Sequence, residues 1–172
     1  NQGSIKKPKT GDLLFIPQKP YMLLGSLREQ LCYPTEVEKF SDDHLISVLN
    51  EVKLNSIVDR YPNLDVKQDW PRILSLGEQQ RLAFARLLLN SPRFAVLDEA
   101  TSSLDGITEN AIMDAINNLS HKKTIIMIAH RLSTVKGCDI IHFMSNGKII
   151  ESGTCQQLIE SNEEFKRMAN HL

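Results

Sequence analysis

The pattern of apolar and polar positions separates a mostly helical first half of the chain from a second half in which strands and helices alternate. A short apolar run that ends at Pro17 predicts a buried strand, and the sequence Ser26-x-x-Glu29 is a capping box that predicts a helix start. The elements expected in this half are the strand at 12–17, a loop at 18–25, helices that begin at Ser26 and Ser41, one or two helical turns at 54–61, and a polar loop at 62–72.

In the second half, helical and strand-like patterns follow one another in turn. The segment 94–97 is wholly apolar, which predicts a strand buried on both faces of a parallel sheet. This order of elements predicts an α/β fold with parallel strands beside a mostly helical subdomain. The elements expected here are helices at 77–90 and 107–119, buried strands at 94–97, 124–129 and 139–144, a hairpin turn at Asn146-Gly147 leading into 148–151, and a final helical region capped by Thr154 and Gln157.

Composition narrows the classes of protein to which this chain can belong. Hydrophobic residues make up 41% and charged residues 24% of the 172 residues, and the net charge is −1, so we expect no nucleic-acid partner. Its apolar runs are far shorter than the ~20 residues that span a bilayer, and no signal peptide is visible at the start. The three cysteines are widely spaced and match no zinc pattern, which favours reduced structural cysteines.

Polar side chains follow two of the predicted strands, at the edge where α/β sheets bind their ligands. Asp98 and Glu99 come directly after an apolar strand, where two carboxylates are costly unless something uses them. Asp98 would hold Mg²⁺, and Glu99 would act as general base on an attacking water, a role worth roughly 10²–10⁴ in rate. His130 follows the next strand and could orient that water. The alternatives are a solvated acidic turn for the carboxylates and a structural role for His130.

The segment LSLGEQQR opens a strong helix and is a candidate phosphate site. The N-terminus of a helix offers free backbone N–H groups and a partial positive charge, both of which attract phosphate. Ser75 adds a hydroxyl group, and Gly77 allows a close approach of the backbone. Taken alone, the segment is better explained by ordinary capping of the helix by Ser75.

The order of these segments resembles that of the ABC ATPase family. FIPQKPY resembles the Q-loop with its glutamine at Gln18, LSLGEQQR the ABC signature, and FAVLDE the Walker B strand. The sequence 102–105 resembles the D-loop, with Asp105 at its end, and IAHR resembles the segment of the switch histidine, His130. The resemblance extends over essentially the whole chain, and the order and spacing of the motifs make it specific.

The resemblance implies a P-loop NTPase (RecA-like) parallel-sheet core, here incomplete, with a mostly helical ABC subdomain at 19–90 and the C-terminal part of the core at 91–172. It implies ATP as substrate with Mg²⁺, and as partners a second ABC ATPase domain and the transmembrane domains of a transporter. Glu99 and His130 would be catalytic. The other residues that it implies are Gln18 and Asp98 at Mg²⁺ and the nucleotide, Ser75, Gly77 and Glu78 at a triphosphate held by the partner domain, and Asp105 at the dimer interface.

Two departures from the family pattern matter. No GxxxxGK motif followed by Ser or Thr occurs, so the phosphate-cradling loop is missing, and we expect a truncated sequence that is inactive and aggregation-prone in isolation. Glu78 stands where the family commonly has glutamine, and its charge beside a polyphosphate requires an offset by Arg81 or a metal. The first half of the chain resembles subfamily D, and the second half resembles bacterial lipid, oligosaccharide and peptide exporters.

Three kinds of function follow. The leading hypothesis is a transport ATPase at the ATP-containing side of a cellular or organellar membrane, whose segment 20–31 after the Q-loop docks the membrane domain. A soluble ABC ATPase of chromosomes or ribosomes would carry long insertions or tandem domains, which this sequence lacks. A degenerate domain that only supplies its signature helix to a partner agrees with the missing P-loop, whereas Glu99 and His130 argue against it.

Overall fold

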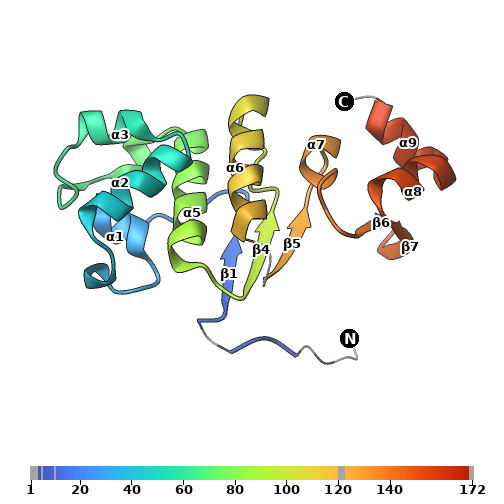
Figure 1. Ribbon diagram of the computed structural model, residues 1–172, viewed down its shortest axis with the longest axis horizontal. Helices are drawn as coiled ribbons and strands as arrows, with labels where there is room; N and C mark the ends of the chain where they lie inside the picture. Colours follow the sequence, from blue (N-terminus) through green and yellow to red (C-terminus); the bar gives the residue numbers. More distant parts are fainter. Residues whose placement is uncertain (1–3, 5, 10, 120–122, 171–172) are drawn as a thin grey trace. The chain divides into compact units, whose positions relative to one another are not determined.

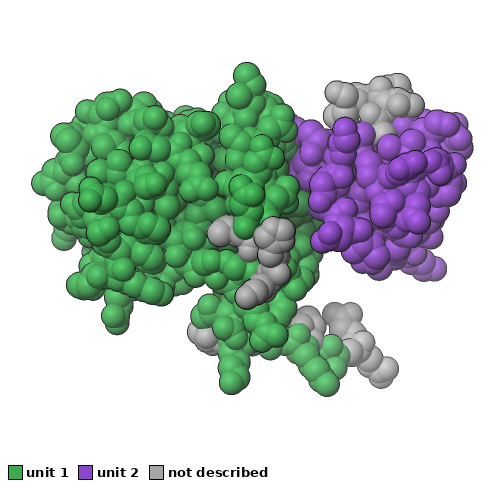
Figure 2. Space-filling model, viewed as in Figure 1, with its two compact units in different colours: residues 1–128 green, residues 129–172 purple. Residues whose placement is uncertain are grey.

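A computed structural model of the chain describes all residues except 1–3, 5, 10, 120–122 and 171–172. The chain divides into two compact units, residues 1–128 and residues 129–172, which Figure 2 shows in green and purple. Each unit has a hydrophobic core of its own.

The first unit is built on a parallel sheet of three strands in the order β1-β4-β5 (Figure 1). These strands are β1 (Leu13–Ile16), β4 (Phe94–Asp98) and β5 (Thr124–Ile128), and β4 pairs in parallel with both neighbours. Their carboxyl ends therefore meet at one edge of the sheet. The parallel strands expected at 12–17, 94–97 and 124–129 are confirmed, with bounds that differ by one residue at one or both ends. The strand expected at 139–144 does not join this sheet; residues 141–145 pair antiparallel with a neighbouring strand in a separate hairpin.

The two faces of this sheet differ in burial, which corrects the expectation of strands buried on both faces. Ile16, Ala95 and Leu97 are buried on the face that packs against helices. On the other face, Phe15 is 54% and Ile126 is 56% exposed, and β5 alternates between exposed and half-buried positions. An all-apolar strand predicts two covered faces, but no described element covers this one.

The helical part of the first unit begins after β1 and forms at the positions that the sequence predicts. Ser26 caps α1 (Leu27–Cys32) with a complete capping box, and Ser41 caps α2 (Asp42–Glu51). A short 3₁₀ turn, η1 (Val37–Lys39), lies between these two helices, and α3 (Asn55–Arg60) follows α2. Leu27, Leu31, Leu45 and Leu49 are completely buried, which explains why these amphipathic segments are stable as helices in the folded chain.

The segment 62–72 is not the plain loop that its polarity predicts. It contains β3 (Lys67–Gln68), which pairs antiparallel with β2 (Gly25–Ser26), and the start of α4 (Trp70–Ile73). The reason lies in Trp70, which is fully buried and donates a hydrogen bond of 2.8 Å from Nε1 to the carbonyl oxygen of Gly25. This long-range contact holds an otherwise polar segment against α1.

Two long helices connect the helical part to the sheet. Helix α5 (Leu76–Asn90) begins at the capping residue Ser75 and ends at Ser91, whose positive φ of 45° closes the helix in the left-handed region. Helix α6 (Gly106–Leu119) follows β4, and in Figure 1 both helices lie along the sheet. Helix α5 contacts α1, α2 and β1, so it joins the helical part to the sheet.

The second unit contains α7 (Leu132–Val135), a hairpin of β6 (Ile141–Ser145) and β7 (Lys148–Gly153), α8 (Cys155–Ser161) and α9 (Glu163–Asn170). The hairpin turn falls at Asn146-Gly147 as predicted, with positive φ at both residues. The predicted capping box of Thr154 and Gln157 opens α8. Across the described part of the chain, none of the helices is long and apolar enough to cross a membrane.

Candidate catalytic edge and signature helix

The carboxyl edge of the sheet brings Gln18 and Glu99 into direct contact. Gln18 follows β1, Glu99 follows β4, and Gln18 Nε2 donates a hydrogen bond of 2.9 Å to Glu99 Oε2. The contact arises because β1 and β4 are parallel neighbours, so that the residues after them emerge side by side. Two residues that the sequence selected separately thus form one pair.

Glu99 has a backbone conformation that residues other than glycine seldom adopt. Its φ is +48°, and its N–H donates a hydrogen bond of 2.9 Å to the carbonyl oxygen of Ile128 at the end of β5. A left-handed conformation at a non-glycine residue costs on the order of 1–3 kcal/mol and is typical of functional sites. The strand therefore ends in a turn that aims the Glu99 carboxylate along the sheet edge toward Gln18.

Asp98 is the last residue of β4 and lies on the open face of the sheet, paired in register with Ile128. Carboxylate and amide oxygens, such as those of Asp98 and Gln18, are hard ligands of the kind that Mg²⁺ prefers. The described residues contain no group of three or more His, Cys, Asp or Glu side chains that could hold a metal ion. A site with one or two protein oxygens still fits Mg²⁺, which commonly keeps several waters and takes its other ligands from substrate phosphates.

His130 lies in the second unit and follows the end of β5 at Ile128 by two residues. Its side chain is exposed. Its role toward Glu99 remains a prediction from the sequence.

The signature segment forms the N-terminus of α5 and is held by a complete capping box. Ser75 Oγ accepts a hydrogen bond of 3.3 Å from the Glu78 N–H. In return, Glu78 Oε2 accepts hydrogen bonds of 2.9 Å from the Ser75 N–H and 3.0 Å from Ser75 Oγ. Gly77 favours a close approach, since a Cβ at this position would lie a tight 3.1 Å from the carbonyl oxygen of Ser103. The capping role predicted for Ser75 is confirmed.

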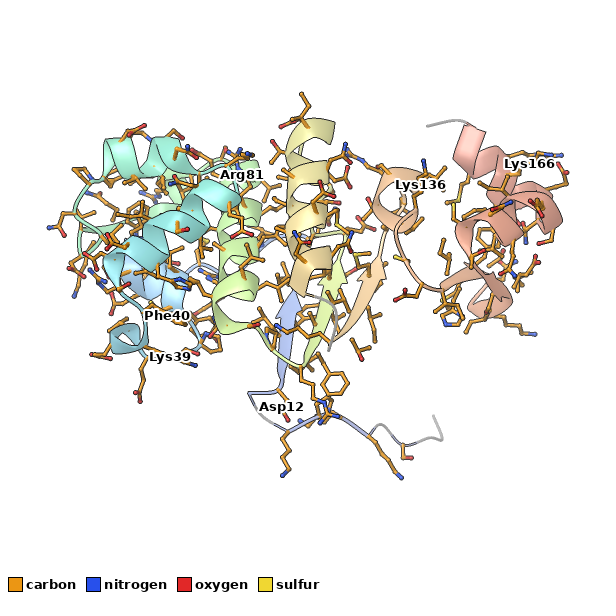
Figure 3. The ribbon with its side chains drawn as sticks, viewed as in Figure 1. Asp12, Lys39, Phe40, Arg81, Lys136 and Lys166 are labelled. Carbon is orange, nitrogen blue, oxygen red and sulfur yellow. The ribbon has the colours of Figure 1, made fainter. Side chains whose placement is uncertain are left out.

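The cation that offsets the charge of Glu78 is Arg60 rather than the expected Arg81. Arg60, the last residue of α3, places Nη2 at 2.5 Å from Glu78 Oε1. Burial is the largest single influence on the pKa of Glu78 and raises it. The hydrogen bonds from Ser75 and the charge of Arg60 together outweigh burial, so the pKa of Glu78 is lowered. Arg81 projects from α5 (Figure 3), and its buried Nε has no hydrogen-bond partner among the residues that the structure describes. Sequence alone could not select Arg60, because it lies on a separate helix.

The D-loop segment between β4 and α6 is fixed by short-range polar contacts. Asp105 caps α6 by accepting hydrogen bonds from the N–H groups of Ile107 at 3.1 Å and Thr108 at 3.0 Å. These contacts, first among them the one from the Thr108 N–H, lower the pKa of the Asp105 carboxyl. Glu109 is buried and accepts a hydrogen bond of 2.9 Å from Thr101 Oγ1.

Three polar residues of α5 that sequence reasoning missed, Gln79, Gln80 and Arg86, are buried in the first unit. Gln80 bonds to the segments of Gln18 and Ser103, and Arg86 bonds to the loop that precedes α1. Burial lowers the pKa of Arg86 to about 10. The sequence contains one indication of this burial: these residues lie on the apolar face of the predicted helix. A polar side chain on such a face must find hydrogen-bond partners inside the protein.

Arg86 fixes the loop 21–24, which exposes apolar side chains. Its guanidinium donates to the carbonyl oxygens of Gln30 at 2.5 Å and Tyr21 at 2.6 Å, and to Gln30 Oε1 at 2.9 Å. Gln30 in turn bonds both backbone groups of Leu23. On this loop, Tyr21 is 64% and Leu24 is 96% exposed. Apolar side chains are thus exposed on a loop whose backbone is held by hydrogen bonds at Tyr21 and Leu23.

The chain belongs to the ABC transporter family, since the family model described as ABC transporter matches residues 4–102. It is 48% identical to an uncharacterized ABC transporter ATP-binding protein from Synechocystis sp. over 130 residues, which cover 76% of this chain and 19% of that protein. It is 43% identical to ABC transporter D family member 2, chloroplastic, from Arabidopsis thaliana, over 74% of this chain and 22% of that protein.

Among solved structures, the chain is similar to a bacterial Atm1-family ABC exporter with ATP bound, with a TM-score of 0.81 and 28% identity. The match covers 92% of this chain and 28% of that exporter. This similarity confirms the predicted fold class, a parallel-sheet core with helices that is consistent with an incomplete P-loop NTPase. The resemblance to subfamily D and to exporters is confirmed as well, since transporters of the D and B families are among the relatives. The chain spans about a fifth of the length of the curated relatives named above.

Proposed function

We propose that this chain is part of a nucleotide-binding domain that hydrolyses ATP to power transport across a membrane. The observation that carries the proposal is the hydrogen bond of 2.9 Å between Gln18 and Glu99 at the carboxyl edge of the sheet. It joins the Gln18 amide to the carboxylate of Glu99, a residue whose backbone has a positive φ. The pair lies at the edge where α/β sheets bind ligands. Family membership supports the choice of ATP as the substrate.

In the proposed reaction, Glu99 accepts a proton from the attacking water, and Gln18 holds the Glu99 carboxylate in position. Magnesium bound by oxygens of Asp98 and Gln18 would neutralise charge on the phosphates, as in other phosphoryl transfers. His130 would hydrogen-bond the terminal phosphate. Catalysis then depends on positioning and electrostatics rather than on a covalent intermediate.

The signature helix would serve a second nucleotide, held by a partner ABC domain. Ser75 and the N-terminus of α5 offer a hydroxyl group and backbone donors for a terminal phosphate, and Gly77 keeps this turn against the D-loop. Asp105 would lie at the interface of the two domains. The exposed Tyr21 and Leu24, on a loop fixed by Arg86, would contact the membrane domain. Through that domain the chain would be associated with a membrane.

The test uses the whole transporter that we propose contains this chain. Glu99→Gln should reduce ATP hydrolysis by roughly 10²-fold or more, leave ATP binding intact and accumulate a nucleotide-bound dimer. Hydrolysis near the wild-type rate would show that Glu99 is not the base. The alternative is a degenerate domain that lends only its signature helix to a partner. In that case ATP turnover would be insensitive to Glu99→Gln and sensitive to Ser75→Ala.

A further inference from the structure

Gln80 is a completely buried amide on the second turn of α5. Its Nε2 donates hydrogen bonds to the carbonyl oxygen of Gln18 at 2.9 Å and to Ser102 Oγ at 3.3 Å. Its Oε1 accepts a hydrogen bond of 3.1 Å from the Ser103 N–H. One side chain thus bonds two segments that lie far apart in the sequence.

One of these segments carries the Gln18–Glu99 pair. Gln80 holds the main chain of Gln18, and the side chain of Gln18 donates to Glu99 Oε2 at 2.9 Å. Gln80 is therefore connected to Glu99, the proposed base, through a single residue, Gln18. A shift of the Gln18 backbone would move its amide away from the Glu99 carboxylate.

The other segment is the D-loop, which the first turn of α5 also contacts. Gly77 packs closely against the Ser103 carbonyl oxygen, since a Cβ at this position would make a tight contact of 3.1 Å with it. Gln80 bonds the N–H of the same Ser103. The signature end of α5 and the D-loop backbone are consequently held together from two sides.

We propose that Gln80 is a positioning residue of the hydrolytic site. It keeps Gln18 in register with Glu99 and ties this catalytic pair to the signature helix of the same chain. The inference rests on the proposed ATPase function, in which that helix serves the nucleotide of the partner domain. Gln80 would then connect two sites within one chain. One is the hydrolytic site with Gln18 and Glu99, and the other is the signature helix that contacts the nucleotide of the partner domain.

The physical argument concerns unpaired groups in a buried place. An apolar residue at this position leaves the Gln18 carbonyl and the Ser103 N–H without their partner, and both segments must shift to find another. A displacement of about 1 Å at a reacting group can cost on the order of 10²-fold in rate. The loss should appear in kcat, because the geometry of the base matters more in the transition state than for nucleotide binding.

The adjacent residue supplies a matched control. Gln79 has the same side chain, is also buried, and donates to the carbonyl oxygens of Leu74 at 2.9 Å and Pro71 at 3.2 Å, which lie on the segment before α5. Replacing it removes a buried amide from the same helix without touching the bonds to Gln18 and Ser103. Gln79→Leu and Gln80→Leu are therefore compared in the whole transporter, by kcat, KM for ATP and the midpoint of thermal unfolding.

We expect Gln80→Leu to lower kcat at least about tenfold with KM for ATP changed by no more than about twofold. Gln79→Leu should lower the unfolding midpoint while kcat stays within about twofold of wild type. If both variants lose kcat in proportion to their loss of stability, or if Gln80→Leu retains kcat, Gln80 is structural only and the inference is overturned.

Should Gln80→Leu not yield folded protein, Gln80→Asn decides the question. Its amide keeps a donor and an acceptor but is one methylene shorter, so it cannot reach both the Gln18 carbonyl and the Ser103 N–H. A lower kcat at an unchanged unfolding midpoint supports the positioning role, and a wild-type kcat overturns it. The proposed function is tested separately. If the wild-type transporter hydrolyses ATP and Glu99→Gln abolishes this activity, the proposed function holds whatever the Gln80 variants show. A transporter that does not hydrolyse ATP, or in which Glu99→Gln has no effect, contradicts the proposed function itself.

Discussion

Gln18 Nε2 donates a hydrogen bond of 2.9 Å to Glu99 Oε2, although the two residues lie 81 positions apart in the chain. Parallel pairing of β1 with β4 brings the ends of both strands to the same edge of the sheet. The backbone of Gln18 is held by Gln80, and that of Glu99 by the carbonyl oxygen of Ile128. This contact joins two residues of the proposed ATPase site.

The first prediction concerns Gln18 itself. Gln18→Ala removes the donor to Glu99 and an oxygen ligand proposed for Mg²⁺, so ATP hydrolysis should fall by roughly 10- to 100-fold. The Mg²⁺ concentration that gives half of the maximal rate should also rise. The measurement is a steady-state ATPase assay of the whole transporter at several Mg²⁺ concentrations. Lys19→Ala at the neighbouring exposed position is the control, and an equal loss in both variants would contradict the role of Gln18.

The second prediction concerns the pair of Arg60 and Glu78. Arg60→Ala leaves the half-buried Glu78 carboxylate without its cation, beside the site proposed for a terminal phosphate. KM for ATP should therefore rise by roughly tenfold, the order expected for a charge-assisted hydrogen bond. Adding Glu78→Gln to Arg60→Ala should restore most of the lost affinity, because the neutral amide no longer repels phosphate. Arg72→Ala is a suitable control, since the Arg72 side chain is 87% exposed. Failure of Glu78→Gln to restore KM would exclude repulsion as the cause.

The third prediction concerns pH. Hydrogen bonds from Thr108 lower the pKa of Asp105 in the folded chain below its ordinary value of 3.8. The unfolded chain therefore binds the proton more readily, so this carboxylate stabilises the fold above about pH 4 and the contribution disappears as pH falls through the folded pKa. The folded domain should lose stability below about pH 4. Asp105→Asn keeps a capping oxygen and should show a smaller loss over the same range. Urea unfolding between about pH 2.5 and 7 measures this, and parallel curves for both proteins would refute it.

The fourth prediction concerns Arg86. A lysine in its place has a single ammonium group and cannot reproduce the three hydrogen bonds to Tyr21 and Gln30. Arg86→Lys should reduce the free energy of unfolding by about 1–3 kcal/mol, the cost of unpaired buried polar groups. Urea unfolding followed by circular dichroism gives the value, with Arg72→Lys as the exposed counterpart. Equal unfolding midpoints for both variants would show that the hydrogen bonds of Arg86 contribute no stability.

Most elements of the fold could be predicted because their signals are local. The capping boxes at Ser26, Ser75 and Thr154 each satisfy N–H groups of the turn that follows them, so the sequence near each one suffices. The segment 62–72 was predicted wrongly, since the contact of Trp70 with Gly25 is long-range. Burial of the strands was also predicted wrongly, because an apolar strand does not reveal whether another element covers it.

For the site, local sequence patterns specify the residue types and their places at strand and helix ends: Asp98 and Glu99 after one strand, His130 after another, Ser75 at the start of α5. These follow from periodicity and capping, which act over a few residues. Which of these residues meet, and what supports them, depends on the packing of the folded chain. The pairing of Gln18 with Glu99, the choice of Arg60 as the counter-ion of Glu78 and the central position of Gln80 all join separate segments. Such contacts depend on how sheet and helices pack, and no pattern within a single segment specifies that.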